Sequence, residues 1–341
     1  MLTIKVPLVR AEQVKQELMQ RELFAHGYKI TRDKEHIYFP VTEAFDSEFS
    51  FEEKEITPSN NHKPTTLKEA LTEKLPKEIL DQLKTSYDQV GDIAILEIDE
   101  ELKAYEQLIG ETLLATNTKA ATVLAKDAGH EGTFRTQKMR LVAGVDKRVA
   151  LHKENGVVLE VDVEEVYFSA RLSTERKRIA ELVKAGEDVL VMFSGCGPYT
   201  CALAKNTAAK HVTGIEINPK GHELAQKNIK RNKLKNASTY CGDVKVVVPQ
   251  LLAQRTEGFD RILMPLPKSA ETFLDTAISA LKPGGIIHFY AFLHQDEFLQ
   301  ANEWITEACT LASRSALFLG TSRCGQQAPY VFRICVDAQI D

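Results

Sequence analysis

The chain has 341 residues, which is too long for one typical hydrophobic core and enough for two or three domains. Hydrophobic residues make up 43% of the sequence and charged residues 27%, as in an ordinary soluble globular protein. The net charge of −5 gives no overall attraction to nucleic acid, although a local basic face can still bind RNA. No apolar run is long enough to span a bilayer, so we expect no membrane contact.

The cysteines and the start of the sequence indicate where the protein works. The opening stretch, "MLTIKVPLVRAEQ", lacks the charged start and long apolar segment of a signal peptide. All six cysteines lie between Cys196 and Cys335, and none forms a CxxC pair. This pattern favours reduced thiols over a disulfide framework or a metal site, so we expect a cytoplasmic protein that binds no metal.

A small first domain is expected over residues 1–60. Apolar and polar residues alternate over 2–8 as in a strand, and apolar residues have helical spacing over 11–23. Residues 36–41 are again typical of a strand. The polar stretch over 56–66, "ITPSNNHKPTT", then has the composition of a linker.

A middle α+β domain is expected over residues 66–165. Its last part is a predicted hairpin, because Asn155-Gly156 is a strong two-residue turn signal between alternating segments. The other expected elements are helices over 67–75 and 101–116 and strands over 92–98, 121–126 and 139–144.

From residue 166 to 341 helices and apolar strands alternate, which predicts a doubly wound, Rossmann-like α/β domain. The expected helices cover 174–186, 200–206, 221–233 and 270–282, and the expected strands cover 188–193, 211–217, 237–243, 261–266 and 284–292.

A cofactor site is expected where the first of these strands ends. Gly195 and Gly197, in "MFSGCGPYT", let the backbone approach a ligand at the carboxyl edge of the sheet. Thr200 occupies the third glycine position of the dinucleotide fingerprint, so nicotinamide binding is disfavoured. No GxxxxGK[ST] segment occurs, which removes the P-loop alternative.

Acidic residues end the next two predicted strands. Glu216 is placed to hold two ribose hydroxyls, and Asp243 can accept a hydrogen bond from an adenine amino group. The alternative to a cofactor site is that the glycines only form a tight turn and that both acids are solvated strand ends. Together the three features resemble a class I S-adenosylmethionine methyltransferase, although Val191 stands where such enzymes usually carry an acid.

Further segments narrow this resemblance to one family. They include "YKITRDKEHIYFPV", "TVLAKDAGHEGTFRTQKMRLVAG", "HKENGVVLEVDVEEVYFSARLSTER", "EINP" and "LPKSAETFLDTAI". In this order they resemble the archaeal and eukaryotic tRNA (guanine37-N1)-methyltransferases, which modify the guanosine on the 3′ side of the anticodon. The resemblance implies a tRNA substrate and a first domain that docks on the tRNA elbow. We expect a monomer without an obligate protein partner, because tRNA contact by several domains of one chain needs no partner subunit.

The resemblance also assigns roles to residues. N1 of guanine is a poor nucleophile until a base removes its proton, and charge then gathers on O6. By resemblance, Glu175 of "LSTER" is the base and Arg135 of "FR" is the O6 donor. The implied pocket residues are Tyr167, Phe168, Pro265 and Pro267, and the implied cofactor residues are Arg176, Phe193, Gly195, Gly197, Glu216, Ile217, Asp243 and Val244.

The loop "MPLP" departs from the family. The family places Asn before Leu-Pro, where its amide orients the guanine, but Pro265 offers neither a donor nor an acceptor side chain. Three hypotheses therefore stay open: guanine-N1 methylation, a changed reaction on a wyosine-type tricyclic nucleoside or with the aminocarboxypropyl arm, and tRNA binding without catalysis. A basic run is either a tRNA phosphate contact or a solvated helix face; it comprises Lys227, Lys230, Arg231, Lys233 and Lys235.

Overall fold

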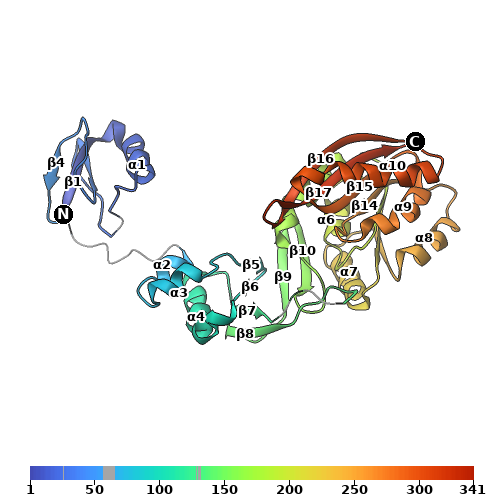
Figure 1. Cartoon of the computed structure of the whole chain (residues 1–341), viewed down its shortest axis with the longest axis horizontal. Coiled ribbons are helices and arrows are strands. Elements are labelled where there is room, and N and C mark those ends of the chain that lie inside the picture. Colours follow the sequence, from blue (N-terminus) through green and yellow to red (C-terminus); the bar gives the residue numbers. More distant parts are fainter. Residues whose placement is uncertain (26, 57–65, 128, 130–131) are drawn as a thin grey trace. The chain divides into compact units, whose positions relative to one another are not determined.

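The computed structural model of the protein describes residues 1–25, 27–56, 66–127, 129 and 132–341 (Figure 1). The chain forms two compact units, Met1–Lys74 and Leu75–Asp341, and each is described here by itself. The predicted linker lies almost wholly at 57–65, outside the described residues. Within the described ranges, every helix is too short or too polar to cross a bilayer.

The first unit is a small antiparallel sheet covered by a helix. Val14 and Leu18, four residues apart on α1, place their side chains on one face of that helix. They pack with Ile4, Val6 and Phe39 of the sheet. In sheet order the strands are β2 (Thr31–Arg32), β3 (His36–Pro40), β1 (Leu2–Pro7) and β4 (Phe51–Glu53), and the helices are η1 (Leu8–Arg10), α1 (Ala11–Gln20) and α2 (Leu67–Leu71).

The second unit begins with a four-stranded mixed sheet. β6 and β7 are parallel and are joined by the helical crossover of η2 and α4, as parallel neighbours require. In sheet order the strands are β5 (Asp88–Val90), β6 (Ile93–Leu96), β7 (Thr122–Lys126) and β8 (Met139–Gly144), and the helices are α3 (Lys77–Gln82), η2 (Glu100–Tyr105) and α4 (Glu106–Thr116).

The predicted hairpin is confirmed as β9 (Val149–Glu154) and β10 (Val157–Asp162). Asn155 and Gly156 both have positive φ, 43° and 74°, the backbone of a type I′ turn. The hairpin is bonded to the sequence-distant helix α7 (Pro219–Arg231), because Asn228 Oδ1 accepts from Glu160 N at 2.7 Å. This contact fixes the hairpin beside the domain that follows it.

The rest of the second unit is a doubly wound sheet, which confirms the predicted fold class. β17 runs antiparallel to both neighbours, and the first five strands in sheet order are parallel. The order is β13 (Ala237–Cys241), β12 (His211–Glu216), β11 (Asp188–Val191), β14 (Phe259–Met264), β15 (Leu281–His294), β17 (Val331–Ile340) and β16 (Ala316–Ala328). The helices are η3 (Ala170–Leu172), α5 (Ser173–Leu182), α6 (Pro198–Asn206), α7, α8 (Val244–Leu252), η4 (Ala270–Phe273), α9 (Leu274–Ala280), η5 (Gln295–Glu297) and α10 (Leu299–Leu311).

Both faces of this sheet are covered by helices, as the near-continuous apolar strands predict. Leu190 of β11 belongs to a buried cluster with side chains of α8 and α9. Its neighbours Val189 and Val191 belong to a second cluster with side chains of α5 and α6. β11 lies between β12 and β14, where the strand order reverses, and this topological switch point is where doubly wound sheets bind ligands.

Besides two short 3-10 helices, η3 and η5, four longer elements of this domain were not predicted from the sequence. The segment "VKVVVPQLL" forms α8 although its β-branched residues and its internal Pro249 favour other structures. Burial of Val247, Val248 and Leu251 overrides that local preference. The other three are α10, β16 and β17.

Candidate functional site

A cavity of about 260 Å³ opens at the carboxyl edge of the parallel strands. Its walls come from the loops that follow β11, β12, β13 and β14. A segment that precedes β8 supplies Arg135, and the stretch after β10 supplies Tyr167. Residues from separate parts of the second unit therefore share one enclosure at the switch point.

The glycine loop forms one wall of the cavity. Gly195 lines it with a φ of 56°, and Phe193 lines it with a φ of 57°. Phe193 is held in this sparsely populated conformation by its edge-on contact with Phe273, with ring centroids 4.9 Å apart. Gly197 is not among the lining residues in the described part of the chain; its φ of 82° instead starts α6, and a Cβ there would meet Ala225 at 3.3 Å.

Glu216 is buried in the cavity wall beside this loop. Its Oε2 accepts from Gly195 N at 2.6 Å, and its Oε1 accepts from Asn218 N at 2.8 Å. Burial raises the pKa of the Glu216 carboxyl, although the backbone N–H groups oppose that shift. Gly221 of α7 leaves space for this carboxylate, since a Cβ there would lie 3.0 Å from Glu216 Cγ.

The chemistry of the walls fits an adenosyl group. Asp243 is the N-cap of α8, and its Oδ1 accepts from Lys245 N at 2.8 Å. Val244 and Ile217 line the cavity between the two acids. Ser194 also lines the cavity, while its Oγ is buried next to Gly214 of β12 and has no hydrogen bond in the described structure.

Arg135 and the loop after β14 form the opposite part of the wall. Arg135 has a φ of 53°, and its Nη2 donates to Lys268 O at 3.2 Å. Burial lowers the pKa of its guanidinium, which nonetheless stays charged at neutral pH. Pro265 lines the cavity, whereas Pro267 does not line it within the described residues, and its carbonyl accepts from Phe292 N at 3.0 Å.

Arg176 lines the cavity, but its guanidinium is already bonded to other residues of the protein. It is 1% exposed, and its Nε and Nη2 contact Glu154 at 2.5 and 2.6 Å. Its Nη2 also donates to Ser169 O at 3.0 Å. The ring of Phe168 lies 5.4 Å from the guanidinium, behind the wall and not in it.

Glu175 lies behind the residues that line the cavity. Its carboxylate is buried, and it is not among the residues that line the cavity in the described structure. Arg178 Nε and Nη2 each donate to it at 2.8 Å, and Tyr290 Oη donates to its Oε1 at 2.7 Å. The structure thus brings Arg135 to the cavity and leaves Glu175 behind the cavity wall.

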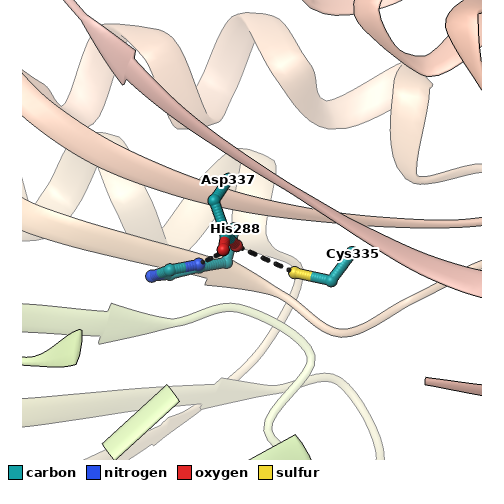
Figure 2. A group of neighbouring side chains, drawn as sticks. All are labelled: His288, Cys335 and Asp337. Carbon is teal, nitrogen blue, oxygen red and sulfur yellow. Dashed lines mark hydrogen bonds and ion pairs between the residues drawn. The ribbon is translucent and has the colours of Figure 1, made fainter. Parts of the chain in front are cut away.

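A buried charge network continues from Glu175. Arg178 Nη1 donates to Asp337 Oδ2 at 2.6 Å, and Asp337 Oδ1 bonds to His288 Nδ1 at 2.6 Å. His288 Nε2 lies 2.7 Å from Arg261 Nη1. Figure 2 shows His288 and Cys335 pointing toward the Asp337 carboxylate. The spacing of these three side chains suits a metal ion, but the two adjacent guanidinium groups already occupy the carboxylate and the imidazole.

Comparison with known proteins identifies the family. A family model described as the TRM5/TYW2 methyltransferase domain matches residues 150–314. Models of the TYW2 N-terminal domain and of the tRNA methyltransferase 5 N-terminal domain match residues 67–147 and 3–49. The tRNA (guanine(37)-N(1))-methyltransferase Trm5b of Pyrococcus abyssi is 34% identical over 99% of both chains. The chain belongs to the Trm5 family.

Solved structures agree with this assignment to the Trm5 family. The crystal structure of Pyrococcus abyssi Trm5b matches with a TM-score of 0.78 at 33% identity and covers 100% of this chain and 99% of its own. A complex of aTrm5 with tRNALeu matches with a TM-score of 0.72 at 30% identity and full coverage of both chains. A more distant relative, the tRNA 4-demethylwyosine(37)-methyltransferase Taw21 of Saccharolobus solfataricus, is 31% identical over 59% of this chain and 75% of its own.

Within this Trm5-family fold, sequence reasoning missed several wall residues. Tyr199 begins α6 directly after the glycine loop, and Asn218 caps α7 with its Oδ1 on Lys220 N at 3.0 Å. Both lie next to motifs that were recognised, so their position in sequence was an available signal. Leu266 had the same signal, because it lies between Pro265 and Pro267 in the "MPLP" loop, whereas only the fold brings Phe273 to the cavity.

The basic run on and after α7 is partly neutralised. Lys227 contacts Glu223 at 2.7 Å, and Arg231 contacts Glu160 at 2.5 Å. The other members, which are all exposed, are Lys230, Lys233 and Lys235. The run therefore has less free positive charge than its sequence indicates, and its contact with tRNA phosphates stays a prediction.

Proposed function

We propose that this protein transfers a methyl group from S-adenosylmethionine to N1 of the guanosine on the 3′ side of the anticodon in tRNA. One observation carries the proposal: Glu216 and Asp243, suited to an adenosyl group, share a single cavity with Arg135 and the loop of Pro265, suited to a base. The relationship to Trm5b along almost the whole chain supports the same reaction.

The cofactor end of the cavity uses the residues after β11, β12 and β13. Glu216 would accept hydrogen bonds from the ribose hydroxyls, and Asp243 would accept one from the adenine amino group. Phe193, Ile217 and Val244 supply apolar walls for the adenine. Arg176 keeps this wall in place through its buried ion pair with Glu154, and Gly197 contributes through the turn into α6.

The base end of the cavity uses Arg135 and the loop that follows β14. The bound cofactor supplies an activated methyl group on its sulfonium. Arg135 would donate to O6 of the guanine as negative charge gathers there, and its contact with Lys268 O holds it close to Pro265. Tyr167, whose hydroxyl accepts from Arg333 Nη2 at 2.7 Å, forms a fixed side of this pocket. Glu175 would be the final acceptor of the N1 proton.

A second candidate substrate is a wyosine-type tricyclic nucleoside at the same tRNA position. Pro265 favours it, because the cavity loop has no amide with which to orient a guanine. Val191 also departs from the expected acid and is fully buried in an apolar cluster, so the methionine arm of the cofactor has one contact fewer. The similarity to Taw21, a tRNA 4-demethylwyosine(37)-methyltransferase, supports this alternative substrate.

Mass spectrometry of nucleosides separates these substrates. Unmodified tRNA and tRNA that carries the tricyclic precursor are incubated with the protein and S-adenosylmethionine, and the digested nucleosides are compared. We expect 1-methylguanosine from the unmodified tRNA. A methylated product from the tricyclic tRNA alone would move the assignment to the second substrate, and binding without any product would leave a non-catalytic tRNA-binding protein.

We further propose three functional domains at 1–60, 66–165 and 166–341, of which the first adds tRNA affinity without taking part in the chemistry. Support comes from the first unit having its own core and holding none of the cavity residues. Removing residues 1–60 should raise KM for tRNA and leave the single-turnover rate at saturating tRNA unchanged. Equal tRNA affinity of the truncated and whole chains would contradict this role. We expect the protein to be cytoplasmic and monomeric. Sedimentation with and without tRNA tests the oligomeric state.

A further inference from the structure

The position of Glu175 raises a question that rests on the proposed function. The carboxylate proposed to take the N1 proton is buried behind the cavity wall, and its described contacts are all with protein groups. A base at that position can accept the proton only if other groups carry it through the wall. Tyr199 is a wall residue, and Tyr290 lies between it and Glu175.

Two tyrosine hydroxyls join the wall to the carboxylate. Tyr199, in the first turn of α6, bonds through its Oη to Tyr290 Oη at 3.1 Å. Tyr290, on β15, donates from its Oη to Glu175 Oε1 at 2.7 Å. The Tyr290–Glu175 distance is typical of an O–H···O hydrogen bond and the Tyr199–Tyr290 distance is slightly longer than usual, so the three groups form a continuous chain.

The direction of donation in this chain suits proton movement toward Glu175. An ionised carboxylate only accepts, so Tyr290 must donate its single proton to Glu175. Tyr290 Oη is then an acceptor for Tyr199, whose proton also points inward. A hydroxyl has two acceptor lone pairs, so Tyr199 Oη keeps one with which it can accept a proton from a ligand group that reaches it.

The surroundings keep the chain neutral and dry. Ile179, Val191 and Leu263 are fully buried in the same cluster as the two tyrosines, so the tyrosine side chains lie among apolar residues. Burial raises the pKa of Tyr199 and of Tyr290 above the ordinary value, so neither ionises at neutral pH. In such an enclosure hydrogen bonds are strengthened, and water does not compete for them.

The acceptor end of the chain is fixed by charge. Arg178 donates two hydrogen bonds to Glu175 and is itself paired with Asp337 at 2.6 Å. The guanidinium compensates the buried carboxylate, which would otherwise be costly to desolvate. Because Arg178 Nη2 shares Oε1 with Tyr290, removal of the Tyr290 hydroxyl would still leave that oxygen with a donor.

We propose that Tyr199 and Tyr290 relay the proton from N1 of the target guanine to Glu175. The N1–H bond breaks and a bond to Tyr199 Oη forms, while the proton of Tyr199 passes to Tyr290 and that of Tyr290 passes to Glu175. The electron pair left on N1 forms the new N–CH₃ bond, and the pair of the broken S–CH₃ bond stays on sulfur. Both tyrosines end neutral, and the proton on Glu175 is later released to water.

Phenylalanine variants test the relay. Tyr199→Phe and Tyr290→Phe each remove one hydroxyl and keep the ring, and the exposed Tyr330→Phe is the matched control. Single-turnover methylation of unmodified tRNA is measured with saturating S-adenosylmethionine in mixtures of H₂O and D₂O. We expect each relay variant to be slower by about 10²-fold or more, since the base loses its proton path. The parent and Tyr330→Phe should show a curved dependence on deuterium fraction, which reports several moving protons.

Two further measurements separate a relay from a structural role. The affinity for S-adenosylmethionine and the melting temperature should change little in the relay variants. Members of one relay act as a unit, so the Tyr290→Phe, Glu175→Gln double variant should be no slower than the slower single variant. If the rate loss of the double variant equals the product of the two single losses, the tyrosines only support the fold. The same conclusion follows if the relay variants are slower but keep the curved deuterium dependence of the parent.

The outcomes for the relay and for the proposed function are distinct. A parent enzyme that produces 1-methylguanosine, with tyrosine variants within about twofold of its rate, overturns the relay and leaves the proposed function standing. A parent enzyme that never produces 1-methylguanosine overturns the proposed function and the relay together.

Discussion

The cavity and the charge network behind it differ in their residue types and in how completely their polar groups are bonded. In the cavity, Ser194 Oγ has no partner among the described residues, and Phe193 and Arg135 hold left-handed backbone conformations. In the network, Glu175 and Arg178 are bonded on several sides, and no buried polar atom without a partner occurs there in the described structure. Incomplete bonding and local strain are typical of a region that receives a ligand, whereas complete bonding holds charges in place.

Glu175 lies at the junction of these two regions. Its contacts belong to the network, and its proposed role belongs to the cavity. The comparison teaches that a motif such as "LSTER" selects a residue for a proposed role but does not predict the contacts that this residue makes. The following predictions test the division between a receptive cavity and a fixed network, beginning with the largest expected effect.

Replacing Glu175 with Gln should lower the single-turnover rate of methyl transfer by roughly 10²–10⁴-fold, because the amide cannot accept the proton. Affinity for S-adenosylmethionine, measured by calorimetry, should stay within about twofold, since Glu175 does not line the cavity. Glu181→Gln, an exposed position on the same helix, is the control. A normal rate for Glu175→Gln would show that the proton leaves by another route.

Replacing Pro265 with Asn should raise the rate of guanine methylation, by on the order of 10²-fold at most, because positioning errors of about 1 Å can cost that much. The new amide would face the cavity from the loop after β14. Pro267→Asn, outside the described cavity wall, should give no such gain. A fall in guanine methylation by Pro265→Asn would indicate a pocket shaped for the tricyclic nucleoside.

Replacing Asp243 with Ala should weaken S-adenosylmethionine binding by about 1–3 kcal/mol, or roughly 5- to 150-fold, through loss of the adenine hydrogen bond. Isothermal titration calorimetry measures the change directly. Asp296→Ala removes an exposed acid from η5 and should leave binding unchanged. If both variants bind as the parent does, the adenine lies elsewhere in the cavity.

Lowering the pH should destabilise the network through His288. Burial holds the pKa of His288 below its ordinary value of 6.5, so the folded protein keeps the ring neutral while the unfolded chain takes up a proton. Stability from this group is complete above pH 6.5 and falls as the pH drops below it, by about 1.4 kcal/mol per pH unit at most. Urea unfolding between about pH 7.5 and 5.5 measures the slope.

His288→Gln provides the control for this pH dependence. The pKa values of His211 and His222 are also lowered by burial, so they add to the slope of the parent. The His288→Gln variant should keep the part of the pH dependence that comes from His211 and His222 and lose the part that comes from His288. An unchanged slope in His288→Gln would show that the network does not hold a neutral imidazole.

The fold was largely predictable because its strongest signals are local. The Asn155-Gly156 turn and the alternation of β11, β12 and β13 with α6 and α7 follow from positive φ preferences and apolar periodicity. α8 was missed since its β-branched run and Pro249 conflict locally with a helix. Only packing against the sheet resolves that conflict, and packing partners are distant in sequence.

The sequence by itself determined the doubly wound class, the glycine loop, the acids at successive strand ends and the segments shared with the Trm5 family. These features depend on neighbouring residues and on regular periods, which one chain displays directly. Tertiary structure decided that Arg135 joins the cavity, that Glu175 does not, and that Tyr199 and Tyr290 connect the two. The contacts of Glu175 with Tyr290 and of Arg135 with Lys268 join residues 115 and 133 positions apart, and no local preference can specify which side chain of a buried helix meets which strand.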